Sequence, residues 1–530
     1  MKLRRSTHAA LGILVLSSLG ALAGCETDRS PGWYDPYPDE SYPDEIPPDE
    51  PDPFPTCSAM PACDANIHVD PQGPALVITD PVVLAKVPLQ RVVEQINQQS
   101  GIAMTATETM QRLFDTMNDS SAGKFEGGFH CDDIGSPAFQ TKSEDTFTCP
   151  RAEGALASTD AFFQQGHPDS FFPVAIVNRF DLTTTDGTRC GQYRVIYAKQ
   201  SGLTDPNNRV FLIFEASMLS PSPGCLESCR PLATYLKDLE GRTSTEIADR
   251  IDQLFFVGLE GFLPVVHPMH YGLGADDTGY GGHEGGQVRV SMHMEDPWDM
   301  REMRLGFNGA GDQIAFVPTT VKNNPAASSF DPTNPSWSGE LVRNEMIPMS
   351  LHTLAAGELT AIQMFTPLEA NAVESVLGGE KKSDFFTAAT AAGDTSFVET
   401  IDSMLEGSGF GADCPVDDPL DGEAILKRAT ALSCAGCHAP KEMLGEDRGI
   451  GCGLTWPDSI GQSHVTEKSE LSPALTEVFL PHRAKVMETF LQACDMDAIL
   501  GGLQSSDGGM KSGVEMRRAP GRTLGGSRTH

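Results

Sequence analysis

Long apolar runs are scarce in this sequence. After the stretch 9–22, no segment approaches eighteen consecutive apolar residues, so the rest of the chain is expected to lack a transmembrane helix and to fold in water. Cations are also scarce: 38 Lys and Arg stand against 73 Asp and Glu, and the net charge is −35. Because phosphates would be repelled, we expect no nucleic-acid partner.

Motifs of several common enzyme classes are missing as well. The sequence contains no Gly-x-Ser-x-Gly, no phosphate-binding loop and no dinucleotide fingerprint. These absences give no support to a serine hydrolase, a nucleotide triphosphatase or a nicotinamide enzyme.

The first residues are typical of an export signal. A cationic start precedes the apolar stretch 9–22, which is too short to span a bilayer. Residues 22–25 read Leu-Ala-Gly-Cys and resemble the lipobox of bacterial lipoproteins. The resemblance implies that a signal peptide, residues 1–24, is removed and that Cys25 is lipidated. The lipid would then hold the chain at a membrane of the cell envelope, facing the periplasm or the exterior. The alternative interpretation of residues 1–25 is an ordinary secretory signal with an incidental cysteine.

Two terminal segments lack apolar surface to bury. Residues 25–56 are dominated by Pro, Asp and Glu, with a repeated Tyr-Pro-Asp-Glu, which predicts an extended, disordered tether. Residues 501–530 are rich in Gly, Ser and Arg and are expected to form a disordered tail.

Residues 57–350 are predicted to form an α+β body. Thr105 and Glu108 have capping-box spacing, and Thr243 and Glu246 repeat it at the start of a helical insertion. The expected antiparallel strands, separated by turn formers, are 173–182, 192–199, 209–219, 287–294 and 313–318. After this central antiparallel sheet we expect helices at 351–377 and 384–405, within a helical segment 351–410.

Thirteen cysteines suit an oxidising compartment, so disulfides are the default interpretation for most of them. Cys57 and Cys63 share one short loop, and so do Cys225 and Cys229, which makes two local bridges worth testing.

One motif has specific chemistry. Residues 434–438 read Cys-Ala-Gly-Cys-His, the spacing of c-type haem attachment, and chance at the chain's own Cys and His frequencies does not explain it. Two thiols separated by two residues reach the two vinyl groups of one haem, and the adjacent His438 ligates iron. Two alternatives stay open: disulfides formed by Cys434 and Cys437, or a zinc site that also uses neighbours such as His464.

The surroundings of the motif extend this interpretation. Helical spacing at 422–432 precedes it, and helix-start signals at 472–481 lead to a second amphipathic helix. Together, residues 411–500 resemble a class I mono-haem cytochrome c domain. The resemblance implies a small all-α domain and one covalent haem c held by Cys434, Cys437 and His438.

The sequence differs from that family in the residue available as the sixth iron ligand. A methionine usually comes from the loop before the last helix, but residues 449–471 contain none. His464 is the candidate in this loop, and Met487 is the rival, although it lies on an apolar helical face. An open position is the third possibility.

Other residue groups give weaker signals. A second concentration of metal-binding side chains has no recognised spacing, and ordinary hydrogen-bonded histidines explain it more simply; its members are His267, His270, His283, Glu284, His293 and Glu295. The stretches 177–182 and 189–195 look like segments of uncharacterised predicted lipoproteins from myxobacteria-like organisms, which implies no activity. Arg179 and Asp181 are read as an ion pair that organises a strand edge, with a ligand site as the alternative.

The sequence therefore favours an envelope lipoprotein that carries one haem c for electron transfer, with a β-rich docking or sensing body and a redox partner protein. The alternative is a non-redox surface-binding lipoprotein whose C-terminal cysteines are structural, in disulfides or around zinc. An oxidase or peroxidase is the weakest of the three classes, because a single Cys-x-x-Cys-His does not match the di-haem peroxidases.

Overall fold

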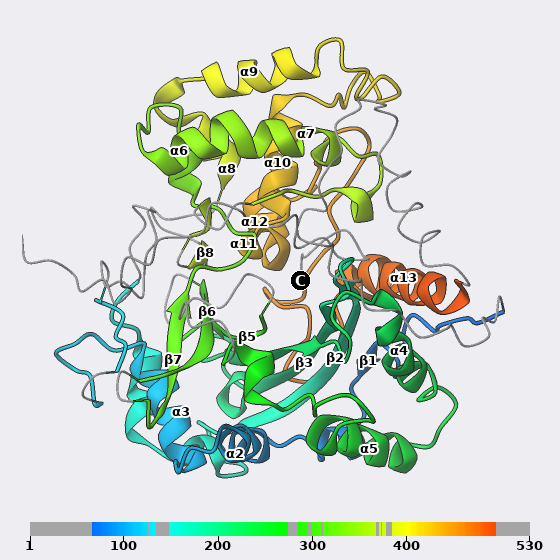
Figure 1. Ribbon diagram of the computed structural model, residues 1–530. Helices are drawn as coiled ribbons and strands as arrows, with labels where there is room; N and C mark the ends of the chain where they lie inside the picture. Colours follow the sequence, from blue (N-terminus) through cyan, green and yellow to red (C-terminus); the bar gives the residue numbers. More distant parts are fainter. Residues whose placement is uncertain are drawn as a thin grey trace, which may run out of the picture. The chain divides into compact units, whose positions relative to one another are not determined.

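An antiparallel sheet runs through the centre of the structure, a computed structural model that describes residues 66–125, 128–133, 148–273, 285–294, 298–308, 311–366, 370–372, 374–377 and 384–493 (Figure 1). The strands of this described part are β1 (Val77–Ile78), β2 (Phe171–Thr183), β3 (Arg189–Lys199), β4 (Val210–Leu219), β5 (Gln287–Met292), β6 (Trp298–Phe307), β7 (Ile314–Thr319) and β8 (Ser375–Leu377). They pair in sequence order from β1 to β7, and β8 pairs with β6. The predicted antiparallel sheet in an α+β fold is confirmed.

The sheet is buried on both faces, and this hides one strand from sequence patterns. In β6, Asp299, Arg301, Glu302 and Arg304 are all buried, so charged residues occur on both sides of the strand. Alternation of apolar and polar residues marks a strand only when one face meets water. The prediction therefore missed β6 and included its two neighbours, β5 and β7.

Helices from the first half of the body cover one face of the sheet. They are α1 (Pro81–Leu84), α2 (Leu89–Ser100), α3 (Ala106–Asp115), α4 (Arg230–Lys237) and α5 (Ser244–Asp252). Both predicted capping boxes are present, at Thr105 with Glu108 and at Thr243 with Glu246. The apolar faces of these helices join the inward side chains of β3 and β4 in one hydrophobic core.

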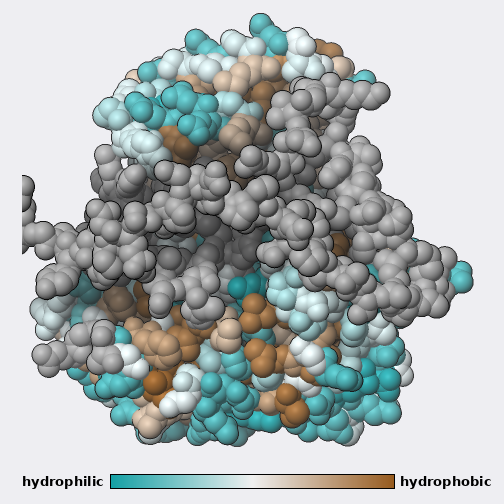
Figure 2. Space-filling view, viewed as in Figure 1, coloured by the Kyte–Doolittle hydropathy of each residue, from teal (hydrophilic) through white to brown (hydrophobic). Residues whose placement is uncertain are grey.

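The second half of the chain forms a helical layer over the opposite face (Figure 1). Its helices are α6 (Trp337–Leu341), α7 (Ile347–Leu354), α8 (Phe385–Ala389), α9 (Ser396–Leu405), α10 (Gly422–Ala431), α11 (Cys434–His438) and α12 (Pro440–Leu444). The last helix, α13 (Leu480–Gln492), lies instead beside α4 and β2. In the view of Figure 2, hydrophilic and hydrophobic residues are mixed over the outer surface of this layer, where Trp337 and Met349 are exposed.

The last helices do not share one core. α10 packs against α7, α8, α9, α11 and α12, whereas α13 packs against β2 and α4. Phe490 of α13 meets Phe180 of β2 edge to face, with 4.8 Å between ring centroids. The stretch 411–500, expected to be a separate small helical domain, thus contributes to two cores, and that separate domain is not confirmed.

The helix expected over 351–377 is much shorter than predicted. α7 ends at Leu354, a 3-10 turn follows at Leu359–Ala361, and the chain then enters β8. Arg428 of α10 stabilises this end, because its guanidinium donates to the carbonyls of Leu354 and Ala356 at 2.8 Å each. Carbonyls at the end of a helix need such partners.

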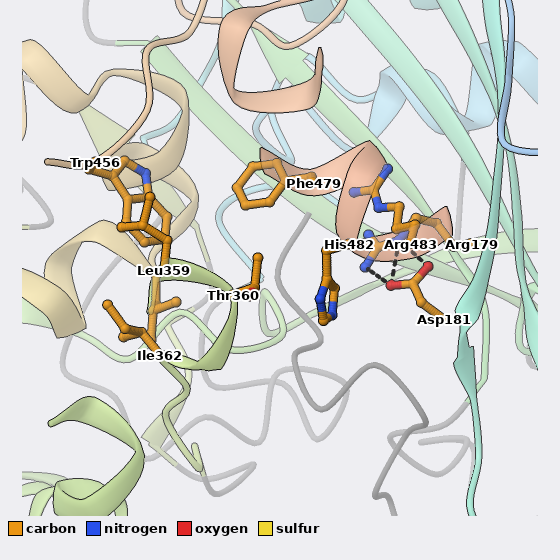
Figure 3. Close-up of a pocket in the computed structure, with 10 residues that line it drawn as sticks. Arg179, Asp181, Leu359, Thr360, Ile362, Trp456, Phe479, His482 and Arg483 are labelled. Atoms are coloured by element: carbon orange, nitrogen blue, oxygen red, sulfur yellow. Dashed lines mark hydrogen bonds and ion pairs between the residues drawn. The ribbon is translucent and has the colours of Figure 1, made fainter. Parts of the chain in front are cut away.

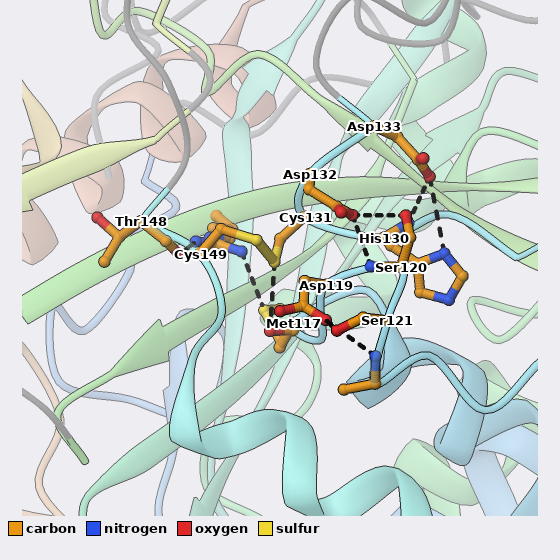
Figure 4. Close-up of a disulfide and its surroundings, with 12 residues drawn as sticks. Met117, Asp119, Ser120, Ser121, His130, Cys131, Asp132, Asp133, Thr148 and Cys149 are labelled. Atoms are coloured by element: carbon orange, nitrogen blue, oxygen red, sulfur yellow. Dashed lines mark hydrogen bonds and ion pairs between the residues drawn. A yellow bond between two sulfur atoms is a disulfide. The ribbon is translucent and has the colours of Figure 1, made fainter.

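Three disulfides lie wholly within the described residues: Cys131–Cys149, Cys190–Cys229 and Cys414–Cys452. The first joins the segments on either side of an undescribed stretch (Figure 4). The suggested Cys225–Cys229 bridge is wrong. Cys229 faces Cys190 of β3, with 5.2 Å between the Cα atoms, and Cys225 is bonded elsewhere.

Several predictions fall outside the described residues. They concern the signal peptide 1–24, the lipidation of Cys25, the tether 25–56, the bridge between Cys57 and Cys63, and the tail 501–530. Among the helices that the structure does describe, none has the length and apolar character needed to cross a bilayer.

Candidate functional site

The Cys-x-x-Cys-His motif forms α11, a short helix that packs between α10 and the sheet. Ser433 caps it by accepting a hydrogen bond from the Gly436 amide at 3.0 Å, and the Cys434 and Ala435 amides donate to Asn324 and to Ser375 of β8. A Cβ atom on Gly436 would lie 1.8 Å from the Thr430 carbonyl oxygen. Glycine is therefore the residue that allows α11 to pack so closely against α10.

Cys434 and Cys437 are fully buried and are not bridged, whereas the other described cysteines are all disulfide-bonded. Burial raises the pKa of the Cys434 thiol to about 12 and also raises that of Cys437, so both sulfurs stay protonated at neutral pH. The disulfide alternative gains no support from this arrangement.

The zinc alternative gains no support from the structure either. Zinc binds thiolates and takes four ligands, but the described residues hold no group of three or more His, Cys, Asp or Glu side chains arranged to bind a metal ion.

His438 is held in one orientation. Burial lowers its pKa to about 4, so the ring is neutral and carries a single N–H. Its Nδ1 lies 3.1 Å from the Gln462 carbonyl oxygen, and donation to that oxygen puts the lone pair on Nε2. Trp298 stacks against the same ring, with centroids 5.6 Å apart. A fixed tautomer with a basic Nε2 is what a metal-binding imidazole requires.

His464 lies beside His438, as the sequence suggested for a residue of the same site, with 4.7 Å between the ring centroids. Both of its nitrogens have partners: Nε2 is 3.2 Å from the Cys437 sulfur and Nδ1 is 3.0 Å from the Ser472 hydroxyl. With a protonated thiol, Cys437 donates to Nε2 and Nδ1 donates to Ser472. His464 would be available to a metal only after this contact with Cys437 is broken.

The rival sixth ligand, Met487, is fully buried in the core formed by α13 and the sheet. Its place there agrees with the apolar face that the sequence predicts for this helix.

A cavity of about 70 Å³ lies between α11 and the sheet. His438 and His464 border it on one side, and β2 to β6 supply the other. Its described lining also includes Val177, Arg194, Ile196, Phe211, Ile213, Glu215, Arg289, Ser291, Met300, Ser463, Val465, Leu475 and Arg483. This volume lies below the roughly 300–1,000 Å³ of small-molecule and cofactor sites.

A row of buried charges crosses the sheet beneath this cavity. Arg194 Nε lies 3.4 Å from Glu215 Oε1, and Arg289 bridges Glu215 at 3.5 Å and Glu302 at 3.0 Å. Burial raises the pKa of Glu215, but Arg194 and Arg289 outweigh it and the pKa is lowered. Glu215 therefore stays charged, the cavity floor is polar, and the Arg289 guanidinium lies close enough to Cys434 to interact with it.

Arg209 fixes the loop that orients both histidines. From the start of β4 it donates to the Gly461 carbonyl, to Ser463 at 3.3 Å and to Glu467 at 2.6 Å. This loop supplies the Gln462 carbonyl that holds His438. Sequence reasoning missed Arg209, Gln462 and Trp298, because nothing local to them signals the contact.

We expect Arg209→Gln to loosen this loop and to lower the free energy of unfolding by about 1–3 kcal/mol, because Glu467 and the loop carbonyl lose a buried charged donor. Amide hydrogen exchange over residues 459–467 measures the local effect. Lys468→Gln, an exposed change in the same loop, is the control. Equal exchange in the two variants would contradict this role.

The second group of histidines does not form a metal site within the described residues. His270 is buried, and its Nδ1 contacts the Val265 carbonyl oxygen at 3.2 Å. His293 instead lies edge-on to Trp298, with 6.0 Å between centroids. His283, Glu284 and Glu295 lie outside the described residues.

Comparisons with models of known protein families, with curated proteins and with solved structures found no match to this chain.

Proposed function

We propose that this chain is an electron-transfer protein with one c-type haem, attached through thioethers at Cys434 and Cys437 and ligated by His438. When bound, the haem supplies a one-electron redox couple. The resemblance of residues 411–500 to class I cytochromes c is part of this proposal and concerns the motif and its flanking helices.

The observation that carries the proposal is the pair of buried, unbridged sulfurs beside an imidazole whose Nδ1 is held by a carbonyl. A chain that forms several disulfides elsewhere would be expected to oxidise two neighbouring thiols unless another chemistry reserves them. Thioether formation consumes both thiols, and the fixed tautomer of His438 directs Nε2 to iron.

The cavity supports the same assignment. It borders His438, and its wall combines apolar side chains with Arg194, Arg289 and Arg483. A porphyrin has an apolar body and two anionic propionates, and these need such a combination. Burial of the site keeps water away from the iron ligand.

For the sixth iron ligand we propose two alternatives. His464 would be the sixth ligand in one form: its ring lies beside that of His438, and its Nε2 would exchange the Cys437 thiol for iron. An open sixth position is the other form, and the Met487 alternative is weakened by the burial of its side chain in a separate core.

We further propose that the protein works at the cell envelope, anchored by lipid at Cys25 and facing the periplasm or the exterior, where the acidic tether separates the body from the membrane. The disulfides in the body agree with an oxidising compartment. Electrons would pass to or from a partner protein.

The test is expression of the full chain in a periplasm with the machinery that attaches c-type haem. We expect one haem per chain in the pyridine haemochrome spectrum, and retention of the haem mass after denaturation. Folded protein without covalent haem, or a mapped Cys434–Cys437 disulfide, would falsify the proposal. Expression without that machinery provides the haem-free form as the control.

A further inference from the structure

Two hydrogen bonds hold His464, one at each nitrogen of its ring. Its Nε2 lies 3.2 Å from the Cys437 sulfur, and its Nδ1 lies 3.0 Å from the Ser472 hydroxyl. That hydroxyl is itself fixed, because it also accepts a hydrogen bond from the Leu475 amide at 3.2 Å. Ser472 therefore takes the Nδ1 proton, and Nε2 is left as the acceptor that faces the thiol.

Aromatic rings enclose this thiol and imidazole pair. The His438 ring lies 4.7 Å from that of His464 between centroids, and Phe479 meets His464 edge to face at 6.1 Å. Figure 3 shows Phe479 and Trp456 in the wall of a small cavity, and the Trp456 indole is close enough to the Cys437 sulfur to interact with it. Because both members of the pair are buried, bulk water does not replace a partner that either of them loses.

Thioether formation would remove the proton on which this arrangement depends. A thiol adds across the carbon–carbon double bond of a vinyl group: the sulfur–hydrogen bond breaks, a sulfur–carbon bond forms, and the proton moves to the second vinyl carbon. No electron is gained or lost, so the step needs no oxidant. The resulting sulfur at Cys437 has no hydrogen to donate, and Nε2 of His464 becomes a buried acceptor without a donor, which is unfavourable.

Iron would be the replacement partner for that nitrogen. His464 and His438 both border the cavity of about 70 Å³ between α11 and the sheet, which is free space next to the two rings. The tautomer that Ser472 holds keeps the lone pair on Nε2, and this is the form in which an imidazole ligates a metal. His464 therefore needs no change of tautomer to exchange the thiol for iron.

We propose that the Cys437 thiol holds His464 away from the iron as long as it keeps its proton, and that thioether formation at Cys437 releases His464 to become the sixth ligand. This inference rests on the haem proposed above. Cys434 has no such role, because no hydrogen bond of the described residues joins it to His464. Covalent attachment and completion of the iron coordination are then two steps in a fixed order.

Urea unfolding of the full, haem-free chain tests the hydrogen bond itself. Cys437→Ala is compared in two backgrounds, wild type and His464→Phe, since phenylalanine accepts no hydrogen bond. We expect Cys437→Ala to lower the urea midpoint when His464 is present and to lower it by less in the His464→Phe background. Equal losses overturn the proposal. If His464→Phe does not fold, Cys437→Ser takes its place: its hydroxyl keeps a donor, and a midpoint no higher than that of Cys437→Ala overturns the proposal.

The visible spectrum of the haem-loaded chain tests the release. Wild type should be low-spin with six ligands, and His464→Phe should be high-spin. Among chains held by the Cys434 thioether alone, Cys437→Ala should be low-spin and Cys437→Ser high-spin, because only the serine hydroxyl still donates to Nε2. The matched control is Cys434→Ala against Cys434→Ser, and their spectra should be alike, because Cys437 forms the thioether in both.

The outcomes separate this inference from the proposed function. Equal spin states in Cys437→Ala and Cys437→Ser, or a low-spin His464→Phe chain, overturn the inference alone, since haem is then attached. Absence of covalent haem from the wild-type chain overturns the proposed function and this inference with it.

Discussion

Replacing Cys434 and Cys437 together by alanine is expected to abolish covalent haem attachment completely, because no other described cysteine is unbridged. The variant should still fold because alanine fits the space that cysteine fills, although His464 Nε2 loses its thiol donor at a cost of about 1–3 kcal/mol. The measurement is the pyridine haemochrome spectrum together with the mass of the denatured chain. Each single replacement should leave one thioether and shift the α-band toward that of a haem with one remaining vinyl group.

A matched control removes two other cysteines. Cys131→Ala with Cys149→Ala eliminates a disulfide and should cost about 2–4 kcal/mol of stability, yet haem attachment should persist. Covalent haem in the Cys434/Cys437 double variant would show that the motif is not the attachment site, whatever else the protein binds.

The second large effect concerns Arg428. This fully buried residue donates to four carbonyl oxygens, of Leu354 and Ala356 at 2.8 Å each, of Ile450 at 2.9 Å and of Gly451 at 3.0 Å. Burial lowers its pKa to about 10, so it remains charged at neutral pH. Arg428→Met should lower the free energy of unfolding by about 3–5 kcal/mol, because it leaves these buried acceptors without a donor.

Urea unfolding followed by circular dichroism measures that loss. The free energy of unfolding of Arg428→Lys should lie between those of wild type and Arg428→Met, because an ammonium group cannot reach all four carbonyls. The control is Lys427→Met on the same helix, whose partner Glu423 is half exposed, and we expect a change within about 1 kcal/mol. A loss below that limit for Arg428→Met would mean that α7 and the loop at residues 450–451 are held by other contacts.

Most elements of the fold could be predicted because their signals are local. The capping boxes join Thr105 and Thr243 to partners three residues away, and β2, β3 and β4 each contain a short apolar run. β6 could not be predicted, because its buried charges are paired with charged residues that come from other strands. The end of α7 depends on Arg428, which is more than seventy residues away along the chain.

The candidate site also combines residues that are close in sequence with residues that are far apart. Cys434, Cys437 and His438 come from one turn of helix, so their chemistry is visible in the sequence. The sheet that lines the cavity opposite them comes from five strands. Arg289 and Glu302 are neighbours only through strand register, and Arg209 reaches its loop across 252 positions of sequence. Distances of this kind have no signature in a single sequence.

Arg483 comes from α13, which packs against β2 and α4, yet it borders the cavity beneath His438 of α11. Local unfolding of α13 would therefore expose the lining of that cavity to water. The candidate site is expected to persist only while both cores of the protein are folded.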